Sequence, residues 1–142
     1  MKPLLVKEIQ RFGETIETFK PTVVKREIAS QRTILHMQEM LEGVVERGTA
    51  YKLWTDRYSF AGKTGTAQIP EEGGFYHPDD TIASFVGWLP ADDPELIILY
   101  KLDRPTRSEW GSETAAPAFA DLASQLVVML DIPPDSVRLA QR

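Results

Sequence analysis

The residues best suited to chemistry form one short run, Lys63-Thr64-Gly65-Thr66. The run lies inside a strand-like pattern, so its two threonine hydroxyls project from the same side of the strand. A lysine ammonium beside them attracts a carboxylate or assists proton movement near a serine. Gly65 lets a substrate backbone approach closely and add itself as an extra strand. The backbone N–H of Thr66 is a candidate oxyanion donor, so the run predicts an acyl-transfer site.

Gly62-Lys63-Thr64 also has a superficial likeness to a phosphate-binding loop. Such a loop requires a glycine five residues before Gly62, where this sequence has Arg57. It also requires a helix after the lysine, whereas Pro70 and Gly73-Gly74 follow a short strand here. We therefore reject nucleotide binding. The triplet Lys-Thr-Gly is weak by itself, because it also occurs on solvated edge strands of unrelated chains.

Hydrophobic periodicity and chain breakers predict the first elements that must position this run. Residues 4–10 and 14–19 indicate two strands of a β-hairpin arm around Gly13. Ser30 is a candidate N-cap for a helix over 31–47, which Gly48 ends. Residues 49–57 are polar and typical of a loop.

Three strands are expected after this loop, over residues 58–69, 81–89 and 95–103. Residues 70–80 are rich in Pro, Gly and acidic residues, and predict a mobile flap beside the motif. The last two strands contain near-continuous apolar stretches, which is typical of strands covered on both faces. A short turn joins them and predicts an antiparallel hairpin.

A second helix is expected to start at Ser112 or Thr114, to end near Leu130 and to lie across the sheet, with a polar tail after it. The predicted fold class is therefore α+β. It comprises an antiparallel sheet of three main strands, an N-terminal β-hairpin arm and two flanking helices.

Composition excludes several classes of function. The chain has 142 residues, of which 42% are hydrophobic, and its net charge is −5. This size suits one cored domain, and the acidic balance argues against nucleic acid as a partner. There is no cysteine, and His36 and His77 show no metal-binding pattern, so neither a metal site nor a cofactor is predicted. No apolar run is long enough to span a bilayer, and the charged N-terminus is not a signal peptide.

Five sequence blocks carry a more specific signal. The run from Ala61 to Gln68, Ala-Gly-Lys-Thr-Gly-Thr-Ala-Gln, resembles the third motif of class B penicillin-binding proteins, the peptidoglycan transpeptidases of elongation and division. Four further blocks, together with the exit Ile132-Pro133-Pro134-Asp135, resemble the same family in the family's order. These are Met1-Lys2-Pro3-Leu4-Leu5-Val6, Met40-Leu41-Glu42-Gly43-Val44-Val45, Ala83-Ser84-Phe85-Val86-Gly87-Trp88-Leu89-Pro90 and Ala115-Ala116-Pro117-Ala118-Phe119.

The resemblance implies a role for each residue of the motif. Lys63 would support the chemistry of a neighbouring serine. The hydroxyls of Thr64 and Thr66 would bind the terminal carboxylate of a D-Ala-D-Ala stem peptide or of a β-lactam. Gly65 would let the ligand approach, and the Thr66 N–H would supply half of an oxyanion hole. The implied fold is part of the penicillin-binding and β-lactamase-like transpeptidase fold.

The family's nucleophile is not found in this sequence. Its reaction needs a serine followed three residues later by a lysine, and none of the seven serines here has one. The second motif, Ser-x-Asn, is also missing, since the chain contains no asparagine. We therefore expect residues 1–142 to be the C-terminal fragment of a transpeptidase domain whose nucleophile region lies upstream. We expect this fragment to be inactive alone and to self-associate through exposed apolar surface.

Two functions remain open on the sequence. The first is the motif-strand part of a membrane-anchored serine D,D-transpeptidase that binds penicillin, cross-links peptidoglycan for cell division or cell shape, and works on the outer face of the cytoplasmic membrane. The alternative is a non-catalytic module, either a β-lactam sensor or a cell-wall scaffold, because one fold serves several functions.

Overall fold

The fold is described by a computed structural model, which covers residues 1–141 except residue 54 and gives no side-chain description for residues 77–79. The chain divides into two compact units, Met1–Ile34 and Leu35–Arg142. The helix α1 (Gln31–Glu46) crosses this division.

The first unit contains a hairpin of β1 (Glu8–Arg11) and β2 (Glu14–Thr18), as the sequence predicts. Its turn places Phe12 at φ 52° and Gly13 at φ 85°. Two successive positive φ values match the right-handed twist of paired strands, and glycine adopts the second without a steric cost. Every residue of both strands is exposed.

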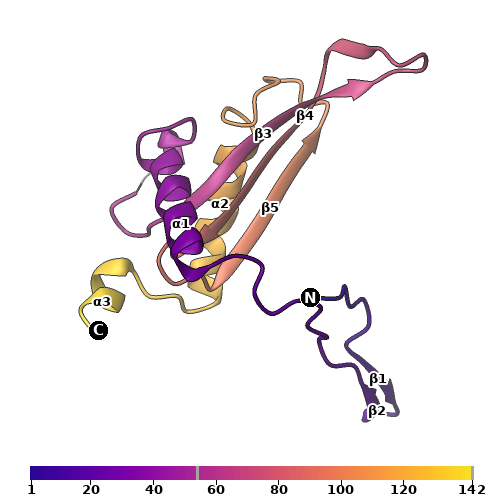
Figure 1. The fold of residues 1–142 in the computed structure, drawn as a ribbon, viewed down its shortest axis with the longest axis vertical. Coiled ribbons are helices and arrows are strands. Elements are labelled where there is room, and N and C mark those ends of the chain that lie inside the picture. Colours follow the sequence, from indigo (N-terminus) through magenta and orange to yellow (C-terminus); the bar gives the residue numbers. More distant parts are fainter. Residues whose placement is uncertain (54, 142) are drawn as a thin grey trace. The chain divides into compact units, whose positions relative to one another are not determined.

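The second unit is built on an antiparallel sheet in the order β3-β4-β5. Figure 1 shows its three strands, β3 (Ala61–Pro70), β4 (Tyr76–Leu89) and β5 (Leu96–Asp103), side by side. Adjacent strands are joined by short turns, which is why their pairing is antiparallel. The predicted α+β class and the three-stranded sheet are confirmed.

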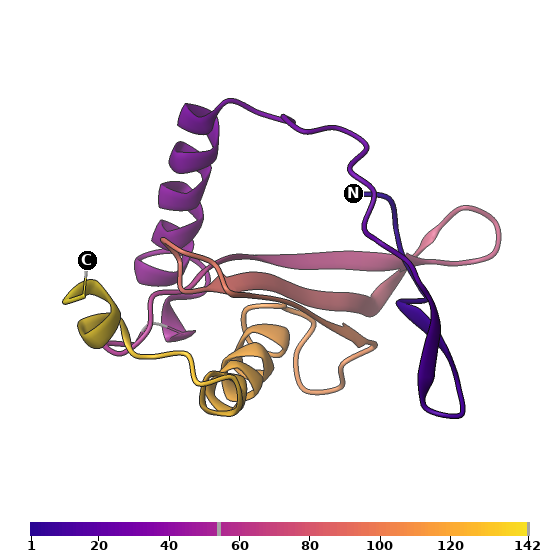
Figure 2. The same cartoon turned by 90° about the horizontal axis from the view of Figure 1, so that it is seen from below.

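The core lies between one face of this sheet and α2 (Ala115–Met129), which Figure 2 shows beneath the strands. Phe119 is fully buried, and its ring packs edge-on against Phe85 at 4.7 Å and Phe60 at 6.0 Å between ring centroids. Such pairs add to the free energy gained by removing the rings from water. Alternate residues of β4 are buried on this face, which fixes the register of the sheet.

The helix α1 begins where the sequence predicts. The backbone N–H of Thr33 donates to the hydroxyl of Ser30 at 3.2 Å, so Ser30 is the N-cap. The predicted apolar face of the helix is less buried than expected, because only Val45 is fully buried within it. The end of α1 therefore carries its contact with the core.

Two predictions about the strands are wrong. The region 70–80 is not a long flap, because β4 begins at Tyr76, pairs Tyr76 with Pro70 and leaves only a short turn. The last two strands are not covered on both faces either. In β5 the exposure alternates, and Ile97 and Leu99 are 71% and 67% exposed. The apolar run of β5 predicted a packed layer on each face of the sheet, whereas the described part of the chain supplies a layer on one face, α2.

The sequence missed two short elements. The 3₁₀ helix η1 (Tyr51–Leu53) lies within the predicted loop and buries Leu53. The helix α3 (Asp135–Leu139) lies in the tail that was predicted to be merely polar. Before it, Asp131 at φ 54° ends α2, and the N–H of Ile132 donates to the carbonyl of Val127. This Schellman-type ending turns the chain back toward the core.

Self-association remains a prediction, and the exposed face of the sheet opposite α2 supports it. Ile97 and Leu99 lie on the face opposite α2, together with the partly exposed Val86. Exposed apolar surface of this kind favours association. We expect a dimer or larger assembly in sedimentation, and Leu99→Lys should shift it toward monomer. A wild-type monomer at every concentration would contradict this expectation.

None of the helices among the described residues is long and apolar enough to cross a membrane.

Candidate functional site

The predicted motif lies on β3, which among the described strands pairs only with β4. Thr64 is opposite Phe85 and Thr66 is opposite Ala83, and both of these β4 residues are buried. The two threonines therefore project from the same face of the sheet, as predicted. The intervening Gly65 lies opposite Ser84.

Lys63 starts on the other face of the strand, opposite Val86, but its amine reaches back to the neighbouring residue. Its Nζ lies 2.9 Å from the carbonyl oxygen of Thr64 and 3.4 Å from the hydroxyl of Thr64. The ammonium and this hydroxyl are thus adjacent. Thr49, in the turn after α1, lies 3.3 Å from the same hydroxyl and limits its orientation.

The hydroxyl of Thr66 is held by the loop before α2. The backbone N–H of Gly111 donates to Thr66 Oγ1 at 3.2 Å. Since this bond uses the oxygen as an acceptor, the hydroxyl proton stays available for donation to another group. Thr66 is exposed, so that group can come from solvent or a ligand.

Gly111 is itself in tight contact with the sheet. A Cβ at this position would lie 2.5 Å from the carbonyl oxygen of Ser84 and 2.6 Å from that of Gly65. No L-side chain fits here unless the backbone moves. Glycine therefore allows the loop before α2 to pack directly against the sheet. Motif reasoning missed this residue, and its position directly before the predicted start of the second helix is the signal that could have indicated it.

Gly111→Ala is expected to push this loop from β3 and to lower the free energy of unfolding by about 1–3 kcal/mol, as overpacking does. The matched control is Gly43→Ala within α1. An added Cβ there meets only the flexible end of Arg47, at 3.3 Å. Since alanine favours helix, this change should stabilise by up to about 1 kcal/mol. Urea unfolding of both variants tests the contrast, and equal effects would contradict it.

The pKa of Glu42, in α1, is raised above its ordinary value. The main cause is burial, and the charges of Glu46, Asp92 and Asp135 add to it. A raised pKa means that the folded chain holds the proton more tightly than the unfolded chain. The associated stability is complete below the unfolded pKa and is lost as the pH rises through the folded pKa.

Glu42→Gln is therefore expected to raise the free energy of unfolding near neutral pH and to leave it unchanged at about pH 3, where the carboxyl is protonated in both states. Urea unfolding at the two pH values measures the difference. Glu39→Gln, on an exposed position of the same helix, is the control and should have the smaller effect. A loss of stability in Glu42→Gln at neutral pH would contradict this interpretation.

Three aromatic residues near the motif strand differ in their surroundings. Phe85 is a core residue, while Trp88 donates its indole N–H to the carbonyl of Ala91 at 3.2 Å. Trp110 is 54% exposed, beside Gly111. No group of three or more potential ligands gathers to bind a metal among the side chains described. The side chain of His77 lies outside those described.

The Lys63 ammonium and the hydroxyls of Thr64 and Thr66 thus lie along β3 of an α+β sheet. Comparison with known proteins assigns the chain to a family. The family described as penicillin binding protein transpeptidase domain matches residues 1–124. The chain belongs to this family, which confirms the class B resemblance drawn from its motifs.

Individual relatives support the same assignment. The chain is 32% identical over 122 residues to stage V sporulation protein D of Bacillus subtilis, covering 85% of this chain and 19% of that protein. It is 33% identical over 131 residues to penicillin-binding protein PbpB of Mycobacterium tuberculosis, which covers 85% of this chain and 19% of that protein. Its fold superposes on penicillin-binding protein 3 of M. tuberculosis, solved in complex with aztreonam, with a TM-score of 0.74 and 31% identity. The superposition covers 91% of this chain and 31% of the other. The chain thus spans about a fifth of the length of these curated relatives.

Proposed function

We propose that this chain supplies the carboxylate-binding strand of a serine-type peptidoglycan D,D-transpeptidase. The observation that carries the proposal is the arrangement on β3, where the Lys63 ammonium lies beside the hydroxyl of Thr64 and the Thr66 hydroxyl faces the same side as Thr64. Hydroxyls on alternate residues of a strand lie about 7 Å apart. A carboxylate between them can accept a hydrogen bond from each, and the ammonium adds charge attraction.

The ligand of this strand is the free carboxylate of a D-Ala-D-Ala stem peptide, and the carboxylate of a β-lactam binds in the same place. Support comes from relatives named peptidoglycan D,D-transpeptidase, such as the homologue of Mesostigma viride, and from related structures that contain ampicillin or aztreonam. Such a protein acts outside the cytoplasmic membrane, where peptidoglycan is assembled, and the intact protein is anchored to that membrane.

Within this reaction, Lys63 assists proton movement at the nucleophilic serine, and the Thr66 N–H donates to the developing oxyanion. The backbone N–H and C=O groups of alternate residues point to the same edge of a strand. Those of Thr64 and Thr66 therefore point to one edge of β3. The nucleophile and the second oxyanion donor come from the upstream part of the domain. Alone, the chain binds ligand without turnover.

The test is titration of the 142-residue chain with N-acetyl-D-Ala-D-Ala, followed by NMR. Thr66→Val keeps the shape of the side chain and removes the hydroxyl, so binding should weaken by about tenfold, which corresponds to one charge-assisted hydrogen bond. Thr15→Val is the matched control, because Thr15 is an exposed strand threonine on β2, in the first unit, and its hydroxyl lies 3.5 Å from a carboxylate oxygen of Glu8. Equal affinity of the wild type and Thr66→Val would overturn the assigned role of Thr66.

A further inference from the structure

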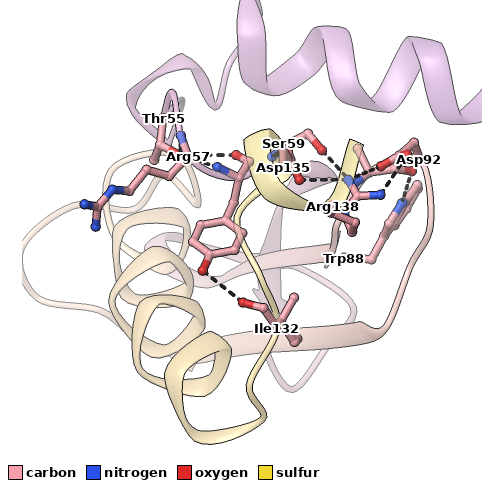
Figure 3. Close-up of polar contacts among 10 residues, drawn as sticks. Thr55, Arg57, Ser59, Trp88, Asp92, Ile132, Asp135 and Arg138 are labelled. Atoms are coloured by element: carbon pink, nitrogen blue, oxygen red, sulfur yellow. Dashed lines mark hydrogen bonds and ion pairs between the residues drawn. The ribbon is translucent and has the colours of Figure 1, made fainter. Parts of the chain in front are cut away.

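The C-terminal segment of residues 132–139, here called the C-terminal strap, is hydrogen-bonded to the three residues that lead into β3. The Tyr58 hydroxyl donates to the carbonyl of Ile132 at 3.0 Å, and the N–H of Asp135 donates to the carbonyl of Arg57 at 2.9 Å. The N–H of Ser59 donates to Asp135 Oδ2 at 2.6 Å. Figure 3 shows these contacts converging on the start of the strand. The strap thus holds the backbone of Arg57 and Ser59 and the side chain of Tyr58.

Arg138 is the central group of this arrangement. Its Nη1 and Nη2 donate to the two carboxylate oxygens of Asp92 at 2.9 and 2.6 Å, and Nη2 also donates to Asp135 Oδ1 at 2.8 Å. The residue is only 9% exposed. Hydrogen bonding to Asp92 is the main cause that holds its pKa above the ordinary arginine value, against the opposing effect of burial. The side-chain Nε is buried and has no partner among the described atoms. The two terminal nitrogens of the guanidinium thus bond to Asp92 and Asp135, while Nε stays unpaired.

These contacts close into a ring. From Arg138 the ring passes through Asp135 to Ser59, whose hydroxyl accepts from the N–H of Ala91 at 3.1 Å. Ala91 is followed directly by Asp92, which returns to the guanidinium (Figure 3). Three segments far apart in sequence, namely the β3 lead-in, the β4–β5 turn and the strap, therefore share one polar network.

The ring lies next to the motif along a short stretch of chain. Ser59 is followed by the buried Phe60 and by Ala61, the first residue of β3, which is fully buried opposite Trp88. Lys63 comes four residues after Ser59. Because only a few residues of extended chain separate residues 57–59 from the motif, holding 57–59 in place restricts the positions that Lys63–Thr66 can take.

We infer that Arg138 is a positioning residue for the carboxylate-binding strand, acting through Asp135 and Ser59. Its importance for ligand binding rests on the proposed function, whereas its hold on β3 does not. A surface ion pair would have little such influence. Here the side chains of Arg138 and Asp135 are only 10% and 18% exposed, although that of Asp92 is 39% exposed. Lysine cannot replace this arginine, because a single ammonium does not provide the planar fork that binds Asp92 through two atoms and Asp135 at the same time.

Residue-resolved amide hydrogen exchange on the full 142-residue chain tests the inference. In Arg138→Lys, the amides of Ser59 and of β3 from Ala61 to Thr66 are expected to exchange about tenfold faster through local opening, while those in the middle of α2 change by less than about twofold. The affinity for N-acetyl-D-Ala-D-Ala should fall severalfold in the same variant. Asp92→Asn weakens the same ring and should act in the same direction. It replaces Arg138→Lys if that variant does not fold.

Arg47→Lys is the matched control, because Arg47 pairs with Glu46 at 2.8 Å on an exposed part of the second unit. It should leave exchange in β3 unchanged. Equal acceleration in β3 and α2 would overturn the inference, because Arg138 would then act only on global stability; an unchanged β3 would overturn it as well. Wild-type chain that fails to bind the dipeptide would count against the proposed function, not against the strap, since exchange is measured without ligand.

Discussion

A fluorescent penicillin incubated with the 142-residue chain is expected to leave no covalent label after denaturation. Acylation by this family needs a serine activated by a lysine three residues later. The seven serines of the chain are followed at that distance by Thr33, Gly62, Gly87, Gly111, Ala115, Val127 and Leu139. Lys63 is present, but it has no nucleophile of this kind to activate.

The expected contrast is large, because a complete transpeptidase domain should be labelled close to stoichiometrically under the same conditions. Such a domain from a relative serves as the positive control, and the heat-denatured chain serves as the control for nonspecific reaction. A denaturation-resistant adduct on the native chain alone would contradict the account, and mass spectrometry of its peptides would identify the serine responsible.

The largest effect on stability is expected for Phe119→Ala. Phe119 is fully buried and contacts both Phe60 and Phe85. The substitution removes transferred apolar surface and leaves a cavity between α2 and the sheet, which costs about 3–5 kcal/mol in comparable cores. Urea unfolding of the chain measures the loss.

Phe75→Ala provides the matched control, because Phe75 lies in the turn between β3 and β4 and is 75% exposed. Its effect should stay within about 0.5 kcal/mol. A similar loss of stability in both variants would show that α2 is not held to the sheet by this aromatic cluster.

Much of the fold was predictable because local pattern and tertiary packing agree. The helix after Ser30, the three strands and α2 follow from periodicity and from one capping side chain. The start of β4 was not predictable, since Tyr76 joins the sheet by pairing with Pro70 and is 62% exposed there. The exposed face of β5 was missed because an apolar run does not reveal whether a second layer is present.

The site was predicted only in part. Sequence spacing placed Thr64 and Thr66 on one face, because strand alternation is a local property. The bond from Gly111 to Thr66 and the contact of Thr49 with Thr64 depend on loops that come together only in the folded chain. Arg138 was missed for the same reason, since its acidic partner Asp92 lies 46 residues away in the sequence. Sequence motifs identified the groups that are proposed to bind the carboxylate, whereas the groups that hold them in place required the structure.

The central claim is that Lys63–Thr66 forms a carboxylate-binding strand, and a chemical-shift map tests it most directly. The ¹⁵N-labelled chain is titrated with N-acetyl-D-Ala-D-Ala, and the L-Ala-L-Ala analogue is the stereochemical control. The account predicts that the largest shifts fall on Thr64, Gly65, Thr66 and Gly111, and that the D,D ligand causes the larger changes. Shifts located elsewhere, or none up to the solubility limit of the ligand, would contradict it.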